Sequence, residues 1–306
     1  MRKGLKFILI LVLLAGGAFL CVTRWQAWFG MSPEYKWTGD MLNCVLPIPN
    51  GETDTVRTFL VLGDIHSHLT REDYDTLAAR VPDCDVVLQT GDWLERGYTY
   101  YQQLFLREWT HSALYGTPVI ACPGNHEYSK GLRMQLSPAW ADVFAHPLNG
   151  PVGVPGASYY ADLPQVRFIV MDTNPLNRLV YLTRTLTWLR QAMYTEEGRF
   201  IVVLMHHPVL PAGRGRFYPL IYAAFRHALG EADLVLAGHD HSYMRRAPFV
   251  VLNTAGSPKP QHTLFTPEAA DSIPTYGVLT IDSVMEFRIF RMENGALLDS
   301  LYVQHD

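Results

Sequence analysis

Side chains that could bind a metal ion and move a proton stand together at Gly124-Asn125-His126-Glu127. The stretch follows the short apolar run Pro118–Cys122, so it lies where a buried strand is expected to end. Burying an amide and an imidazole without partners is costly. That cost is avoided if the amide oxygen of Asn125 binds a metal ion and His126 faces a reacting group. The rest of the chain must then bring further ligands to this point.

Four other apolar runs of strand length also end in metal-ligand residue types. Near-continuous apolar runs are typical of strands that are covered on both faces of a sheet. In mainly parallel sheets, ligands bind beyond the carboxyl ends of the strands, so we expect all these polar groups along one edge. The runs are Thr58–Leu62 before Asp64 and His66, Asp85–Thr90 before Asp92, Phe200–Met205 before His206, and Leu234–Ala237 before His239 and His241.

The segments that position these strands read as helices, because they are long enough and roughly amphipathic. They are Glu72–Arg80, Tyr98–Leu114, Leu182–Tyr194 and Pro219–Leu229. Two more strands are expected at Arg167–Asp172 and Phe249–Thr254, with Asp172 capping or orienting a neighbouring group. The C-terminal runs Tyr276–Asp282, Met285–Met292 and Leu297–Val303 look antiparallel, with a hairpin turn at Asn294-Gly295. The domain should therefore contain a mixed or second sheet.

The N-terminus predicts a membrane element. Arg2, Lys3 and Lys6 precede the apolar run Phe7–Val22, whose helix would span roughly 24 Å, a little short of a ~30 Å hydrocarbon core. An aromatic group from Trp25 to Phe29 favours an uncleaved anchor over residues 1–30, although a removed signal peptide stays open. The early positive charges would put the body in the periplasm or outside the cell, as a single-pass membrane protein or, after cleavage, a secreted or periplasmic one.

Composition fits one large globular domain, because 48% of the 306 residues are hydrophobic and 18% are charged. Residues 31–55 are rich in turn formers and read as a juxtamembrane connector, so the domain proper covers residues 56–306. The net charge of −4 and the absence of a basic stripe give no reason to expect a nucleic-acid partner.

Taken in order, Asp64-x-His66, Gly91-Asp92, Gly124-Asn125-His126-Glu127, His206 and Gly238-His239-x-His241 resemble the calcineurin-like metallophosphoesterase superfamily. The resemblance implies an α/β fold, a four-layer αββα sandwich of two mixed β-sheets flanked by helices, here preceded by the N-terminal transmembrane helix. It also implies a two-metal centre, with His126 as the general acid. The first ion would be held by Asp64, His66, Asp92 and His241, and the second by the bridging Asp92 with Asn125, His206 and His239.

The residue types agree with that assignment. Carboxylate, amide and imidazole ligands suit divalent ions such as Mn, Fe, Zn, Co or Ni. Two ions and a bridging hydroxide, with the carboxylates of Asp64 and Asp92, leave about one positive charge to attract phosphate. Singly, His66 and His241 could be core histidines, and Asp64 and Asp92 could cap helices. Five such groups, each after a strand, favour the ligand interpretation.

Two other residues, Arg96 and His207, have open roles. Gly91-Asp92-Trp93-Leu94-Glu95-Arg96-Gly97 is similar to the Gly-Asp-x-x-Asp-Arg-Gly of Ser/Thr phosphatases, which makes Arg96 either a phosphate ligand or a surface charge. His207 either faces the substrate or packs against neighbouring side chains. The second half looks more like purple acid phosphatases and small bacterial phosphodiesterases, but their iron-binding Tyr falls on Glu95. We therefore expect no purple colour.

These observations predict a metal-dependent phosphoester hydrolase on the outer side of the membrane. Its substrate would be a small phosphoester, with a phosphodiesterase or pyrophosphatase acting on nucleotide or lipid-linked phosphates as the alternative. A non-catalytic binding module on the same scaffold is a second class, and a nuclease is disfavoured by the acidic balance. The loops 128–158, 208–219 and 256–275 should set specificity, but their sequences carry no readable code.

Overall fold

The computed structural model describes residues 42–43, 57–96, 99–128, 136–137, 140, 143–151, 157–177, 179–195, 199–208, 225–257 and 268–305. The predicted membrane segment 1–30, most of the connector 31–55 and most of the three specificity loops lie outside these residues. Among the helices in the described ranges, none is long and apolar enough to cross a membrane.

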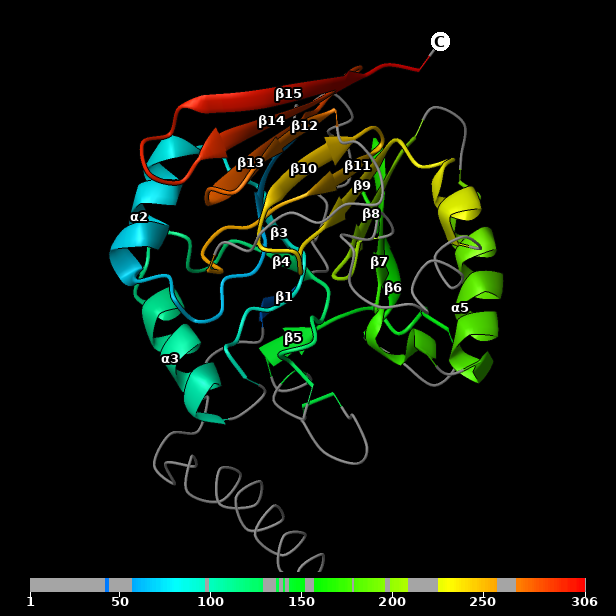
Figure 1. The fold of residues 1–306 in the computed structure, drawn as a ribbon, viewed down its shortest axis with the longest axis horizontal. Coiled ribbons are helices and arrows are strands. Elements are labelled where there is room, and N and C mark those ends of the chain that lie inside the picture. The colour runs from blue at the N-terminus through cyan, green and yellow to red at the C-terminus, as the bar shows by residue number, and fades with distance from the viewer. Residues whose placement is uncertain are drawn as a thin grey trace, which may run out of the picture.

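Two mixed sheets form the body of the molecule (Figure 1). In the six-stranded sheet, three parallel strands are followed across the sheet by three antiparallel ones: β4 (Val119–Ala121), β3 (Val86–Gln89), β2 (Arg57–Leu62), β13 (Thr275–Ile281), β14 (Met285–Arg291) and β15 (Leu297–Val303). The predicted α/β class with mixed sheets is thereby confirmed, as is the C-terminal hairpin.

The seven-stranded sheet has a parallel centre, made by β7 (Val166–Met171), β8 (Phe200–Met205), β9 (Leu234–Ala237) and β11 (Phe249–Val251). Antiparallel pairing adds β6 (Tyr159–Asp162) at one side and β10 (Tyr243–Arg246), then β12 (Ala269–Asp271), at the other. A separate short pair joins β1 (Leu42–Asn43) to β5 (Phe144–Ala145).

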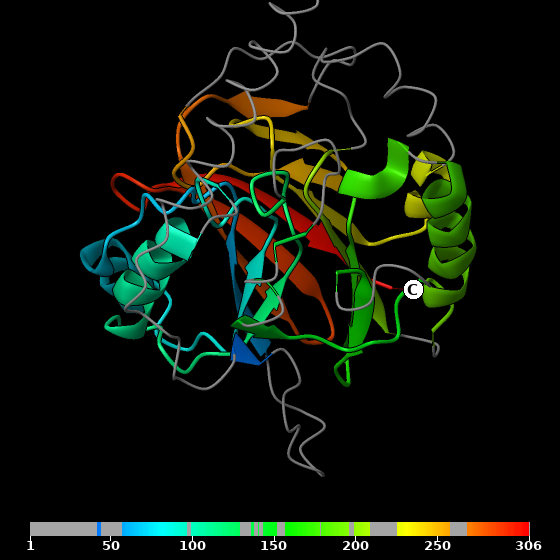
Figure 2. The ribbon, with the colours of Figure 1, turned by 90° about the horizontal axis from the view of Figure 1, so that it is seen from below.

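Helices cover the outer face of each sheet. Figure 2 shows α2 (Arg71–Arg80) and α3 (Thr99–Thr110) on one side and α5 (Leu179–Ala192) on the other. A capping box starts α2, because the Thr70 side chain accepts from the Asp73 amide and the Asp73 carboxylate accepts from the Thr70 amide. A 3₁₀ turn, η1 (Asn174–Asn177), precedes α5. Of the helix predicted at Pro219–Leu229, only residues 225–229 are described, and they are helical.

Three hydrophobic clusters account for the layers. One lies between the sheets, one between the six-stranded sheet and α2 and α3, and one between the seven-stranded sheet and α5. Strand β2 contributes to two of them, since Phe59 and Val61 face the inter-sheet cluster while Leu60 and Leu62 face the helices. Both faces of the strand are thus buried, which explains its uninterrupted apolar sequence.

The structure corrects one expectation about the strands that precede the ligand residues. They do not share the edge of one sheet, because β2, β3 and β4 belong to the six-stranded sheet and β8 and β9 to the other. Strands β10 and β12 were also missed, because they are short and carry charged residues such as Arg245 and Asp271.

The contact between the sheets can be tested at Phe168, which is fully buried and packs edge-on against Phe59 with ring centroids 5.0 Å apart. We expect Phe168→Ala to lower the free energy of unfolding by about 3–5 kcal/mol, because it removes a buried ring and leaves a cavity. Tyr194→Ala is the control, since that ring is 85% exposed and its loss should change stability little. Urea unfolding measures both, and equal effects would contradict the assignment.

Candidate metal centre

The carboxyl ends of five strands from the two sheets meet at one place and bring the predicted ligand residues together. Strands β2, β3 and β4 lead into Asp64 and His66, Asp92, and Asn125, whereas β8 and β9 lead into His206, His239 and His241. Four of these side chains (Asp64, His66, Asp92 and His241) are buried, and their donor atoms lie close enough together to hold a metal ion.

The first group of donor atoms surrounds one point. His66 Nε2 lies 3.0 Å from His241 Nε2 and 3.7 Å from Asp92 Oδ2. Asp64 Oδ1 lies 3.7 Å from His241 Nε2 and 3.9 Å from His66 Nε2. Two carboxylates and two imidazoles thus face one another at the spacing that ligands of a single ion have, since each would sit about 2.0–2.2 Å from it.

A second group adjoins the first. Asn125 Oδ1 lies 3.1 Å from His206 Nε2 and 2.9 Å from His239 Nδ1, and the two histidine nitrogens are 3.2 Å apart. Asp92 Oδ2 lies 3.3 Å from His206 Nε2 as well as facing His66, so this oxygen belongs to both groups.

Backbone carbonyls fix which ring nitrogen carries the hydrogen in His206 and His241. His206 Nδ1 lies 3.0 Å from the Thr90 carbonyl oxygen, and His241 Nδ1 lies 2.9 Å from that of Ser257. A carbonyl oxygen can only accept, so Nδ1 carries the hydrogen in both rings and Nε2 keeps its lone pair when the ring is neutral. Lone pairs that converge in this way repel each other unless a cation or a proton lies between them.

The pKa values of two histidines show how the neighbouring charges act on them. Burial would lower the pKa of His206, but the charge and hydrogen bond of Asp92 outweigh it and raise the pKa to about 9. Burial lowers the pKa of His66 to about 3, against the opposing charge of Asp92. At neutral pH the His206 ring is therefore protonated, while His66 is neutral and able to donate a lone pair.

Five of the seven predicted ligand residues have an unusual backbone conformation. Positive φ angles occur at Asp64 (50°), His66 (53°), Asp92 (56°), His239 (72°) and His241 (50°). Residues other than glycine adopt this left-handed region at a cost of about 1–3 kcal/mol each, and they keep it only where the surroundings enforce it. Here the His66 amide donates to the Asp92 carbonyl at 2.9 Å, and the His239 amide donates to Asp64 Oδ2 at 2.8 Å. Each turn aims a side chain inward directly after its strand.

Two glycines permit the close packing around these ligands. A Cβ atom at Gly124 would lie 2.1 Å from Asp92 Oδ1, and one at Gly91 would lie 2.5 Å from His206 Nδ1. Both distances are far below van der Waals contact. Residues with side chains would therefore displace Asp92 and His206 from the positions described above.

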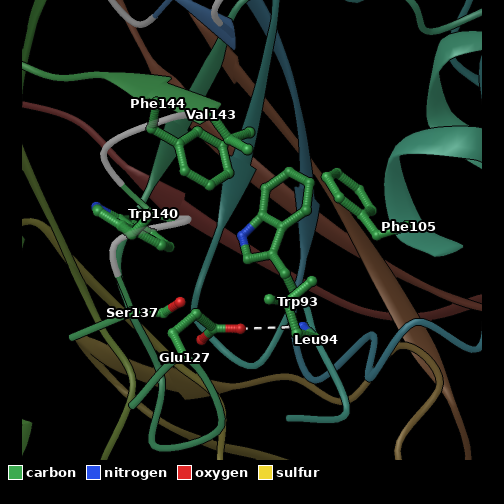
Figure 3. Close-up of a pocket in the computed structure, with 8 residues that line it drawn as sticks. All are labelled: Trp93, Leu94, Phe105, Glu127, Ser137, Trp140, Val143 and Phe144. Carbon is green, nitrogen blue, oxygen red and sulfur yellow. Dashed lines mark hydrogen bonds between the residues drawn. The ribbon is translucent and has the colours of Figure 1, made fainter. Parts of the chain in front are cut away.

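Glu127 ties together the loops that follow β3 and β4. Its buried carboxylate accepts hydrogen bonds from the amides of Asp92 (2.9 Å), Leu94 (2.9 Å) and Gly124 (2.7 Å). Burial, together with the nearby Asp92 charge, raises the pKa of Glu127 to about 7. Figure 3 shows the aromatic rings near Glu127, beside a cavity of about 20 Å³ lined by Glu127, Trp93, Leu94, Phe105, Ser137, Trp140, Val143 and Phe144.

The residues after β7 support the same loop, although sequence reasoning named only Asp172 and gave it a general orienting role. Asp172 accepts a short hydrogen bond from the Tyr128 hydroxyl and one from the Asn174 amide at 3.0 Å. The Asn174 side-chain amide donates to the carbonyls of Pro123 (3.2 Å) and Gly124 (3.3 Å). The polar triplet after the strand, from Asp172 to Asn174, was the signal that could have revealed this support.

The remaining predicted residues lie at or beside the centre. The His126 amide donates to Asp92 Oδ1 at 2.8 Å, and His126 Nδ1 donates to the Glu95 carbonyl, so Nε2 is the ring nitrogen without a hydrogen bond among the described residues. His207 is buried, with Nδ1 2.7 Å from Thr173 Oγ1 and its ring 4.3 Å from that of His239. Arg96 is partly exposed and makes no hydrogen bond or ion pair among the described residues.

Solved structures with this fold include a purple acid phosphatase, PPD1, from yellow lupin (Lupinus luteus) seeds, with a TM-score of 0.65 and 15% identity over 83% of this chain and 54% of the lupin chain. The chain thus spans about half the length of that enzyme. GAP50, the anchor in the inner membrane complex of Plasmodium, gives a TM-score of 0.56 with 13% identity over 82% of this chain and 89% of its own. These likenesses concern the fold.

Sequence comparison gives the family. No curated protein matches the chain. The model of the calcineurin-like phosphoesterase family matches residues 57–243, which contain all seven predicted ligands. Since the match covers more than half of its residues, the chain belongs to the calcineurin-like phosphoesterase family.

Proposed function

We propose that the chain hydrolyses phosphoesters with two divalent metal ions that share Asp92. The observation that carries this proposal is the position of Asp92 Oδ2, 3.7 Å from His66 Nε2 in one donor group and 3.3 Å from His206 Nε2 in the other. One ion would take Asp64, His66, Asp92 and His241, and the second Asp92, Asn125, His206 and His239. Oxygen and nitrogen donors without a thiolate suit Mn, Fe, Zn, Co or Ni.

The chemistry of the donor atoms themselves also fits divalent ions. Acceptor atoms of two histidines lie 3.0 Å apart in a buried site, which a cation between them would stabilise. Divalent ions bound there would supply a water molecule of lowered pKa and positive charge that draws in a phosphate anion. The protein's own part is to hold these atoms in place before substrate arrives, so that no reorganisation is needed during the reaction.

His126 is the residue we assign to proton transfer. Its Nδ1 hydrogen is held by the Glu95 carbonyl, and its amide is held by Asp92, so the ring cannot turn freely. Its Nε2 is left to face a substrate, where a proton bound to it can pass to the departing alkoxide oxygen. Arg96, partly exposed next to Glu95, is our candidate for binding a phosphate oxygen, and His207 for supporting His239 or contacting substrate.

We further propose that residues 1–30 anchor the domain on the outer side of a membrane, and that the substrate is a small or lipid-linked phosphoester. The apolar run Phe7–Val22 after three positive charges supports the anchor. A tether of this kind would hold the centre near lipid headgroups, which favours the lipid-linked class. A phosphodiesterase or pyrophosphatase reaction uses the same donor groups, so a panel of mono- and diesters on the purified full chain decides between them.

Removing the His126 imidazole should slow the chemical step without loss of metal. We expect His126→Ala to lower kcat by about 10²- to 10⁴-fold, and to do so more for an alkyl phosphate than for a nitrophenyl phosphate, because a good leaving group needs no proton. His111→Ala, an exposed histidine at the end of α3, is the control. An equal loss for both leaving groups would rule out proton donation by His126.

The ligand assignment predicts the number of ions. Wild-type protein should hold two equivalents of Mn or Zn per chain, and His239→Ala or Asn125→Ala should hold one, because each removes a donor from the second group only. Mass spectrometry of desalted protein gives the count, and circular dichroism checks that the fold survives. Two retained equivalents in both variants would refute the assignment.

Protons and cations should compete at the centre, and this competition fixes the direction in which stability changes with pH. The folded protein keeps a proton on His206 up to a pKa of about 9, instead of 6.5, and on Glu127 up to about 7, instead of 4.5. Between pH 6.5 and 9 the folded state therefore binds more protons than the unfolded state, and metal-free protein should lose stability as pH rises.

An added divalent ion displaces the His206 proton, so the stabilisation by metal should grow over the same range. Melting temperatures of metal-free and metal-saturated protein across this range test both trends. A metal-free protein that becomes more stable on going from neutral to alkaline pH would show that the proton is not held at His206.

A further inference from the structure

Glu95 touches two imidazoles of the centre through different atoms. Its carboxylate oxygen Oε2 lies 3.3 Å from His66 Nδ1, and its main-chain carbonyl accepts the Nδ1 hydrogen of His126. The three residues also form a group whose donor atoms lie within 4.8 Å of one another. A single residue therefore adjoins one predicted ligand and the predicted proton donor.

His66 needs a partner at the atom that Glu95 faces. The ring is 2% exposed, and its Nδ1 is buried and makes no hydrogen bond of good geometry among the described residues. A buried imidazole N–H without an acceptor costs about 1–3 kcal/mol. The Glu95 carboxylate already lies within ion-pair distance, so a small side-chain rotation completes the bond.

The orientation of the His66 ring indicates the role of Glu95. His66 turns Nε2 toward Asp92 and His241, and Nδ1, on a different side of the ring, toward Glu95. In this position the Glu95 carboxylate does not bind the ion that His66 would hold, but lies on the other side of the His66 ring. Such an arrangement keeps the hydrogen on Nδ1, leaves the lone pair on Nε2 and makes the imidazole a better donor.

We propose that Glu95 is a positioning residue that holds His66 in its metal-binding tautomer and links that ligand to His126. The inference rests on the proposed metal-dependent function and adds to it an asymmetry between the two ions. Only the ion on Asp64, His66, Asp92 and His241 depends on the Glu95 carboxylate, because Asn125, His206 and His239 have no contact with it in the described structure.

The test measures metal affinity, using the purified full chain with Mn²⁺ or Zn²⁺ and a competing chelator. Glu95→Ala should weaken one of the two binding steps by about 10- to 100-fold and leave the other unchanged, whereas Glu95→Gln should restore most of the affinity because its amide oxygen still accepts from Nδ1. Glu72→Ala, an exposed glutamate in the first turn of α2, is the matched control.

Cobalt-loaded protein gives a second readout, since imidazole N–H protons of bound histidines are shifted by the ion and exchange with water when unprotected. One such resonance should be lost in Glu95→Ala and kept in Glu95→Gln. Wild-type affinity at both steps in Glu95→Ala, or an equal loss at both, overturns the positioning role. Failure of the wild-type protein to bind any divalent ion instead overturns the proposed function, and the inference with it.

Discussion

Mutual repulsion among electron-rich atoms is the constraint that the rest of the structure has to satisfy. Carboxylate oxygens and imidazole nitrogens face one another at 3.0–3.9 Å inside the protein, where little water screens them. The interactions among these donor atoms are repulsive and do not keep the group together. The surrounding chain must therefore keep each donor in place, and the backbone turns, carbonyl partners and buried acids around the centre can be understood as means to that end.

The contacts that keep the donor atoms in place lie at increasing distances from the centre. Left-handed turns at the ends of β2, β3 and β9 aim the ligands, and carbonyls of Thr90 and Ser257 choose the nitrogen that faces inward. Farther out, Glu127 fastens three amides of two loops, and Asp172 with Asn174 fastens the loop before Asn125. Conformational strain of this kind is tolerated where it serves a site, and here it coincides with the predicted ligands.

Much of the fold and of the centre could be predicted from sequence, because each ligand follows an apolar run that can only be a buried strand. The partition of those runs between two sheets could not, since β3 and β8 are both fully buried, mainly apolar strands and nothing local assigns them to a sheet. The role of Asn174 could not be predicted either, as it depends on contacts with carbonyls about fifty residues away. Glu95 was identified only as a departure from related motifs, and its contact with His66 needed coordinates.

The division of the donors between two sheets has a consequence for how the protein matures. A chain emerging from the ribosome presents Asp64, His66, Asp92 and Asn125 well before His206, His239 and His241 have been synthesised. Neither group of donor atoms is therefore complete until the seven-stranded sheet has been made and has packed on the six-stranded one. A cation held by these donors would thus be captured late in biogenesis, and it would link the two sheets to each other.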